Sequence, residues 1–138
     1  MKIRVTKDDF LKGKLVTPGW HPCIISSWDD TGKAGENAKN PGSSLTKVEF
    51  KVVDGPDKGT TLFTQFSEVA PAFMVPLIEA VSGKEFDKTK DVEFDVDAAA
   101  MKGKTVDVHV IRGSYNNKPK NEVDGYRKFS GRPAPVGG

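Results

Sequence analysis

Hydrophobic and charged residues alternate strictly in the middle of the chain, from residue 47 to residue 52. A period of two residues is that of a β-strand with one buried face and one solvated face. The apolar positions are Val48, Phe50 and Val52, and the charged positions are Lys47, Glu49 and Lys51. The pattern therefore predicts a strand with a charged outer face.

A second β-rich run, Thr60–Phe66, follows this strand after the turn-forming sequence DGPDKG at residues 54–59. Gly, Pro and Asp clusters of this kind reverse the chain, so the two runs are expected to form a hairpin. Phe63 and Phe66 fall on opposite faces of the second arm whichever register holds. One of the two rings is therefore expected to be exposed.

An earlier strand is predicted from Trp20 to Trp28, after the turn Pro18–Gly19. Both of its faces are partly apolar, so periodicity alone does not determine which face is buried. If His21, Cys23 and Ile25 point inward, both tryptophans are available to a ligand. If they point outward, the tryptophans belong to the core.

A short helix is predicted between Ser67 and Gly83, because apolar residues recur there at helical spacing. Phe73, Leu77, Ile78 and Val81 would form its buried face, and Pro76 is expected to kink or split it. Later strands are predicted at Thr105–Arg112 and Asn121–Phe129. The acidic run Asp91–Asp97 fits a solvated strand face better than a divalent-metal site.

Two polar segments stand out as candidate binding loops, residues 29–43 and residues 113–120. The first is long for a connection inside a compact domain, which is typical of a functional loop or a solvated linker. The second carries Tyr115 at its tip. At the ends of the chain, Thr6 could cap a helical turn through Leu11 in a basic extension, and residues 131–138 are expected to be disordered.

The length of 138 residues predicts one domain, placed at residues 1–130 with the tail beyond it. The net charge is only +2, although bases outnumber acids from Arg112 onward, so charge distribution must carry any argument for a polyanion partner. Cys23 is the single cysteine and is expected to pack as a small apolar residue in a reducing compartment. No signal peptide or membrane span is visible, which favours a cytoplasmic protein.

Catalytic and cofactor motifs are weak. Gly103-Lys104-Thr105 imitates the end of a phosphate-binding loop, but Ala98 stands where that motif needs glycine. His21, Cys23 and His109 lack the paired spacing of a zinc site. The sequence therefore predicts neither an enzyme nor a metal or other cofactor.

Three strands, a helix and two strands are the layout of an OB-fold, a mainly β, five-stranded, partly open barrel. OB-folds bind through the face of strands 2 and 3 and the loops joining strands 1 to 2 and 4 to 5, which here are the two polar segments. Lysines would follow the phosphates and aromatic rings would stack on bases. The candidate residues for nucleic-acid binding are Trp28, Lys33, Lys39, Lys47, Lys51, Phe63, Arg112, Tyr115, Lys118, Lys120, Tyr126 and Lys128.

The sequence also resembles a family of small bacteriophage proteins, catalogued as a phage domain of unknown function and associated with single-stranded DNA-binding proteins. The stretches that carry the resemblance are PGWHPCII, KVEFKVVDGPDKGTTLF, MKGKTVDVHV and NEVDGY. The resemblance implies an OB-fold protein that coats single strands in phage replication or recombination, in host cytoplasm. His21 stands where a tyrosine is expected, and the tail lacks the acidic tip that recruits phage or host replication proteins.

Two other functions remain open at this point. The same barrel could bind RNA, which a preference for the 2′-hydroxyl would reveal. It could instead be a protein-interaction module, because Glu49 interrupts the lysines of the charged strand and the net charge is close to zero.

Overall fold

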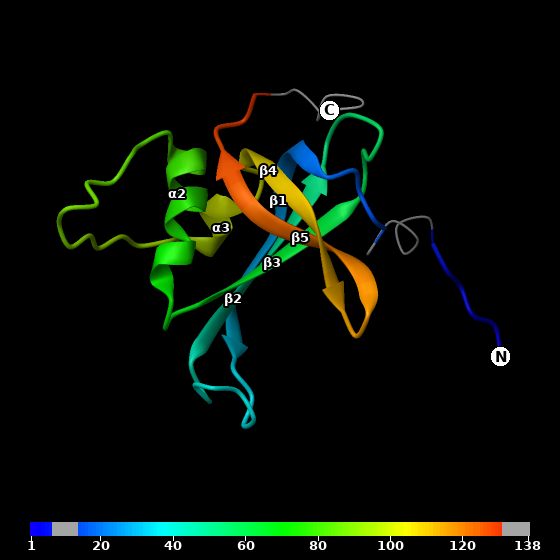
Figure 1. The fold of residues 1–138 in the computed structure, drawn as a ribbon, viewed down its shortest axis with the longest axis horizontal. Helices are drawn as coiled ribbons and strands as arrows, with labels where there is room; N and C mark the ends of the chain where they lie inside the picture. Colours follow the sequence, from blue (N-terminus) through cyan, green and yellow to red (C-terminus); the bar gives the residue numbers. More distant parts are fainter. Residues whose placement is uncertain (7–13, 131–138) are drawn as a thin grey trace.

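Five antiparallel strands curl into one partly open barrel in the computed structural model, which describes residues 1–6 and 14–130 (Figure 1). The strands are β1 (Gly19–Lys33), β2 (Ser44–Val52), β3 (Thr61–Ser67), β4 (Thr105–Tyr115) and β5 (Lys118–Arg127). Their order in the sheet is β3-β2-β1-β4-β5, and the outermost strands β3 and β5 are not hydrogen-bonded neighbours. This order is that of an OB-fold, so the predicted fold class is confirmed.

The inward positions of β2 and β4 supply six residues of the barrel core. Val48, Phe50 and Val52 are buried, as the alternation in β2 predicts. In β4 the equivalent positions are Val106, Val108 and Val110, which are also predicted correctly. Cys23 packs among them as a small apolar side chain.

A β-bulge in β1 decides where the tryptophans point. Ile25 pairs with Phe50 and Ser27 pairs with Glu49, so Ser26 is an extra residue in β1. An extra residue shifts the alternation by one position and moves every later side chain to the opposite face. Trp28 consequently turns into the core, where it is only 7% exposed, although His21, Cys23 and Ile25 also point inward.

Both predicted polar loops are shorter than the sequence suggests. β1 continues to Lys33, which pairs with Ser44, so the loop between β1 and β2 covers only residues 34–43. β4 and β5 extend to a two-residue turn at Asn116 and Asn117, whose φ values of 50° and 62° are those of a tight hairpin turn. Polar ribbons that leave the barrel have no buried face, so they give no hydrophobic pattern to detect.

The predicted helix is split, as Pro76 indicated, into the 3-10 turn η1 (Pro71–Phe73) and α2 (Val75–Ser82). Gly83 ends α2 in the left-handed conformation with φ of 73°, and Leu77 is fully buried against the barrel. Phe73 was expected in the core, but it is 74% exposed, because η1 turns away from the barrel and buries none of its residues.

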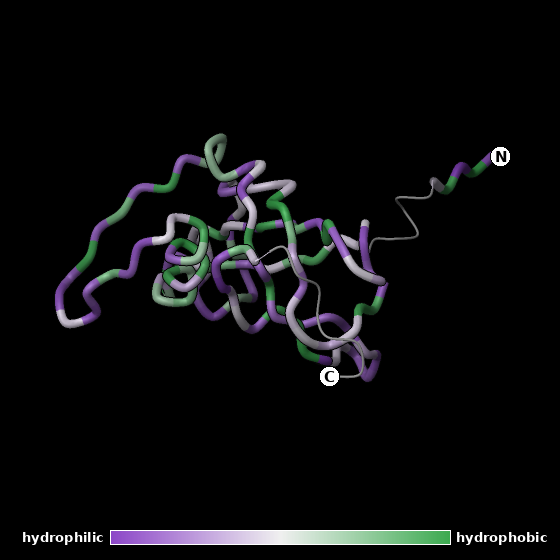
Figure 2. Tube along the Cα trace, turned by 90° about the horizontal axis from the view of Figure 1, so that it is seen from above, coloured by the Kyte–Doolittle hydropathy of each residue, from purple (hydrophilic) through white to green (hydrophobic). Residues whose placement is uncertain are grey.

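The segment between α2 and β4 differs from the prediction. Residues 91–97 form no strand, and they are followed by the short helix α3 (Ala98–Met101), which Asp97 caps by accepting a hydrogen bond from the Ala99 backbone N–H. Both views show the stretch between α2 and α3 extending away from the barrel (Figures 1 and 2). The helical turn predicted near Thr6 and the predicted disordered tail fall largely or wholly outside the described residues.

Candidate nucleic-acid interface

The outer face of β2 and β3 carries the charged pattern on which the prediction rests. Because Val48, Phe50 and Val52 point into the core, the alternate residues of β2 point to solvent. Cross-strand pairing sets them beside the outward residues of β3. The pairs are Lys47 with Gln65, Glu49 with Phe63, and Lys51 with Thr61.

Phe63 is the exposed aromatic ring of this face. Its side chain is 38% exposed, whereas Phe66, on the other side of β3, is buried. The Lys47 ammonium lies 5.0 Å from the centroid of the Phe63 ring. The expectation that one of the two rings is exposed is thus confirmed. The exposed ring, Phe63, also has the Lys47 ammonium beside it.

Strand β1 adds a second row to the same face, with Asp29 opposite Lys47 and Ile24 opposite Lys51. Hydrogen bonds from the Thr31 side chain and backbone lower the pKa of Asp29, and Lys47 lowers it further. Asp29 is therefore a carboxylate at neutral pH. The face as a whole alternates lysines with acids rather than forming a uniformly basic patch.

Two hairpins extend from the barrel, the one between β1 and β2 at the bottom of Figure 1 and the one between β4 and β5 at its lower right. The loop after β1 carries the exposed Lys39, and Lys33 at its base donates a hydrogen bond to Ser44 Oγ at 2.7 Å. The other hairpin presents Tyr115, which is 69% exposed and pairs with Lys118 across the strands. Lys120 is exposed on the same hairpin.

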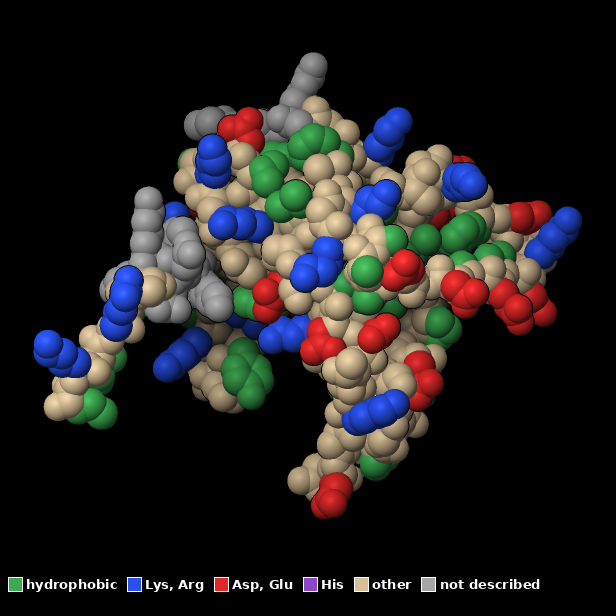
Figure 3. All heavy atoms as spheres, turned by 180° about the vertical axis from the view of Figure 1, so that it is seen from behind, with side chains coloured by type: hydrophobic (Ala, Val, Ile, Leu, Met, Phe, Trp, Pro, Cys, Tyr) green, Lys and Arg blue, Asp and Glu red, His purple; other side chains and the backbone are tan. Residues whose placement is uncertain are grey.

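Figure 3 shows where charge gathers on the side of the molecule opposite to the view of Figure 1. Lysine and arginine side chains are scattered over the barrel, while acids gather toward the segment between α2 and β4 at the right. That segment contains Asp87, Asp91, Glu93 and Asp95, all exposed. A polyanion is accordingly favoured on the barrel and disfavoured at this segment.

Trp28 and Tyr126 were predicted to stack on bases, but Trp28 is buried and Tyr126 is half-buried against the core. The bulge at Ser26 buries Trp28. Tyr126 packs against Phe50 and Phe66, with ring centroids 5.9 and 6.3 Å away. Burial raises the pKa of Tyr126 to about 12, and a side-chain hydrogen bond with Thr64 opposes this rise in part.

Two of the predicted cationic residues, Arg112 and Lys128, lie away from the outer face of β2 and β3. The Arg112 guanidinium donates a hydrogen bond to the Val16 carbonyl at 2.8 Å, and the Val16 side chain is buried in the core, so Arg112 is engaged with the segment before β1. Lys128 is exposed but lies beyond the end of β5 that is distant from the hairpin turn. The predicted residues on the outer face of β2 and β3 are Lys47, Lys51 and Phe63, while Lys33 and Lys39 belong to the β1–β2 hairpin and Tyr115, Lys118 and Lys120 to the β4–β5 hairpin.

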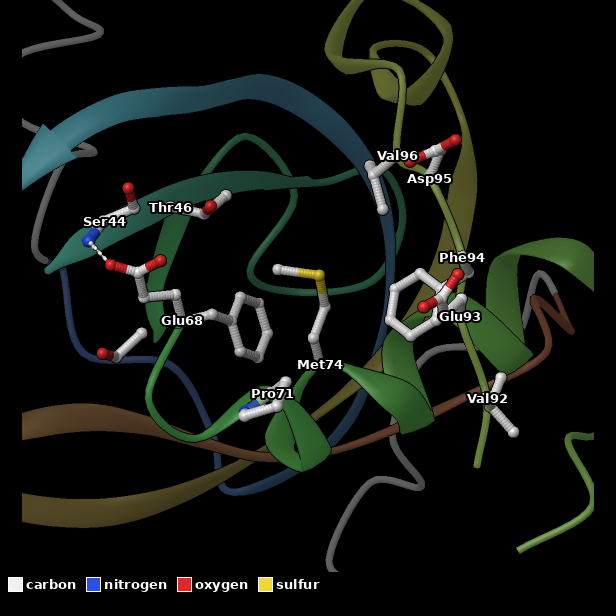
Figure 4. Close-up of a pocket in the computed structure, with 12 residues that line it drawn as sticks. Ser44, Thr46, Glu68, Pro71, Met74, Val92, Glu93, Phe94, Asp95 and Val96 are labelled. Atoms are coloured by element: carbon white, nitrogen blue, oxygen red, sulfur yellow. Dashed lines mark hydrogen bonds between the residues drawn. The ribbon is translucent and has the colours of Figure 1, made fainter. Parts of the chain in front are cut away.

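A cavity of about 720 Å³ opens beside this face, between the start of β2, η1 and residues 92–96 (Figure 4). Met74 extends into it, and Glu68, Glu93 and Asp95 line its wall. The Glu68 carboxylate accepts a hydrogen bond from the Ser44 backbone N–H at 2.7 Å. With three acids in its wall, the cavity does not suit phosphate groups.

The histidines and the cysteine do not form a common site. His21 and Cys23 point into the core, and His21 Nε2 lies 2.5 Å from the Thr17 carbonyl oxygen. His109 is on the outer face of β4, beside Asp124. Within residues 1–6 and 14–130, no cluster of three or more His, Cys, Asp or Glu could hold a metal ion.

Sequence reasoning missed a polar cluster on the outer face of β1, β4 and β5. Asp107 is fully buried and accepts a hydrogen bond from Arg127 Nε at 2.9 Å, and the Arg127 guanidinium lies over the Trp20 ring. The available signal was the polar residues Asp107 and His109 at the outward positions of the apolar strand β4. Their partners come from strands that are distant in sequence.

Comparison with models of protein families and with curated protein sequences finds no match for the chain. In the described part of the chain, none of the helices has both the length and the apolar character needed to cross a membrane.

Proposed function

We propose that this protein binds single-stranded DNA without sequence preference and without catalysis. The observation that carries the proposal is the exposed Phe63 ring on the outer face of β2 and β3, with Lys47 beside it and Lys51 two outward positions beyond Lys47 on β2. This is the face through which OB-folds bind nucleic acids.

The proposed interface combines stacking with charge. A base stacked on Phe63 contributes about 1 to 3 kcal/mol and does so for any base, because every base has a π-face. The lysines along the face and on the two hairpins would bind the phosphates. Tyr115 offers a second ring at the β4–β5 hairpin, so the strand would run from the centre of the face toward that turn.

The preference for single strands follows from how Phe63 is presented. Its ring lies on the outer surface of the sheet, and only an unpaired base can expose its flat face to it. The bases of a duplex are stacked on each other and cannot reach the ring. Glu49 and Asp29 lower the net positive charge, so non-specific attraction of duplex DNA is expected to be weak.

A role in phage replication or recombination is the biological context that the sequence resemblance suggests. In that role the protein would coat and protect single strands for phage or host replication and recombination enzymes. The proposal of DNA binding rests on the Phe63 face and does not depend on this context.

The direct test is fluorescence anisotropy of a dye-labelled oligo(dT), titrated with the protein at several salt concentrations. Trp28 is buried, so an extrinsic dye reports binding better than total tryptophan emission. We expect binding that weakens with salt and that duplex DNA does not compete. Equal competition by oligo(U) would indicate RNA binding, and no binding at low salt would leave a protein-interaction module as the alternative.

A further inference from the structure

The outer face of β1, β4 and β5 carries an arginine that is held flat against a tryptophan, away from the Phe63 face. We propose that Arg127 and Trp20 form a second contact for the bound strand, in which Arg127 binds a backbone phosphate. This inference rests on the proposed function and extends the path of the DNA around the barrel.

Asp107 fixes the position of Arg127. The Asp107 carboxylate is fully buried and accepts hydrogen bonds from Arg127 Nε at 2.9 Å and from Ser130 Oγ at 2.7 Å. The backbone N–H of Ser130 also donates to it, at 3.3 Å. With this many donors around one carboxylate, the side chain of Asp107 has a single favourable position, and Arg127 is aligned by it.

Trp20 supports the guanidinium from the other side. The Arg127 Cζ atom lies 4.4 Å from the centroid of the Trp20 ring, and the His109 ring meets Trp20 edge-on at 4.9 Å. A Cβ at Gly125 would approach the His109 Cβ to 3.3 Å, so glycine at this position lets β5 lie close beside His109. Asp107 and His109 therefore hold the guanidinium and the indole in place.

The outer nitrogens of Arg127 remain available to a ligand. Asp107 takes only Nε, and among the described residues the two terminal nitrogens have no hydrogen-bond partner. The side chain is 45% exposed, and Lys128 follows it in solvent. A planar guanidinium with two free donors suits a phosphate oxygen pair, and little entropy is lost because the group is already ordered.

This contact lies on the same outer surface as the Phe63 face. Ile24 stands between Lys51 of β2 and Thr105 of β4, and Trp20 is four residues away from Ile24 on β1. At about 3.3 Å per residue, Trp20 lies roughly 13 Å from Ile24 along the strand. A single strand that leaves the Phe63 face past Lys51 could thus reach Arg127 when it is long enough.

The first experiment compares Arg127→Gln with the wild-type protein on oligo(dT) of about 5 and about 20 nucleotides, near the two ends of the roughly 4 to 16 bound by one OB-fold. We expect about tenfold weaker binding of the long oligonucleotide, the size of one charged hydrogen bond, and unchanged binding of the short one. Lys90→Gln removes the same charge from the acidic segment and should change neither. Equal losses on both lengths, or no loss, would overturn the inference.

Arg127→Lys is a second variant that separates loss of binding from loss of folding. It keeps the positive charge beside Asp107 and removes only the planar guanidinium with its paired donors. Its melting temperature should stay close to that of the wild type while it binds the long oligonucleotide several-fold more weakly. Binding of the long oligonucleotide at wild-type strength would contradict the proposed geometry.

Tryptophan emission distinguishes a DNA contact at Trp20 from a purely structural role of Trp20 and Arg127. We expect the long oligonucleotide to quench tryptophan emission in the wild-type protein and not in Trp20→Phe, because Trp28 is buried. Binding by anisotropy without quenching would overturn this inference and leave the proposed function intact. Absence of all binding would overturn both.

Discussion

The Lys47 ammonium lies 5.0 Å from the centroid of the Phe63 ring, and the two residues stand on neighbouring strands with the ring partly open to solvent. A cation over an aromatic face at an exposed site contributes about 0.5 to 1 kcal/mol. That is enough to bias the ring toward one orientation but too little to prevent a base from displacing the ammonium. Lys47 would then move from the ring to the phosphate of the stacked nucleotide.

Phe63→Ala is expected to weaken binding of single-stranded DNA by roughly 5- to 150-fold, the range that corresponds to the stacking energy of one base. The measurement is the dissociation constant for dye-labelled oligo(dT). Phe73→Ala is the matched control, because Phe73 is even more exposed but lies on η1. Equal effects of the two substitutions would argue against the Phe63 face.

Lys51→Gln is expected to reduce the salt dependence of binding. Each phosphate contact to single-stranded DNA contributes about 0.7 to the slope of log K against log salt, so the slope should fall by roughly that amount. Lys88→Gln serves as the control, since Lys88 pairs with Glu79 at 2.8 Å, beside α2. An unchanged slope for Lys51→Gln would place the DNA elsewhere.

Deletion of Ser26 is expected to leave Trp28 in the core. Without this extra residue, Ile25, Ser27 and Trp28 alternate strictly and keep the partners Phe50, Glu49 and Val48, so only the local bend of the bulge is lost and the tryptophan emission should stay close to that of the wild type. Thermal unfolding and the wavelength of tryptophan emission measure the effect. Ser26→Ala keeps the bulge and should melt close to the wild type, which separates the extra residue from its hydroxyl.

Cys23 gives a pH prediction. Burial, and to a lesser degree the Asp107 charge, raises the pKa of the Cys23 thiol from 9.0 to about 12. Above pH 9 the unfolded chain loses this proton while the folded protein keeps it, so the free energy of unfolding falls as pH rises from 9 toward 12. Denaturation at pH 8 and pH 10 should show a smaller fall for Cys23→Ala, in which the rise in the pKa of Tyr126 still acts.

Asn117→Gly is expected to stabilise the β4–β5 hairpin slightly, whereas Asn117→Val should cost about 1 to 2 kcal/mol. Asn117 has φ of 62°, a left-handed conformation that glycine adopts without strain and a β-branched residue does not. Melting temperatures measure both effects. If both variants melt like the wild type, the turn does not constrain the hairpin.

The strands that face the core could be predicted from the sequence alone. Val48, Phe50 and Val52 in β2 and the three valines of β4 alternate with polar residues, and burial on one side of a sheet requires that alternation. Pro76 and Gly83 marked where the helical region divides and ends, because proline lacks a backbone donor and glycine adopts positive φ. Of the candidate interface, Phe63 and the lysines of β2 followed from the same alternation.

The rest depended on contacts between distant parts of the chain. Ser26 forms a bulge because its neighbours Ile25 and Ser27 pair with adjacent residues of β2. No local sequence pattern therefore predicts that Trp28 is buried. Tyr126 is half-buried because it packs against Phe50 and Phe66, which come from β2 and β3. Arg127 meets Asp107 and Trp20 through the pairing of three strands. The sequence determined which faces are apolar, and the tertiary structure decided which aromatic and charged side chains reach solvent, since register and bulges are set by pairing partners.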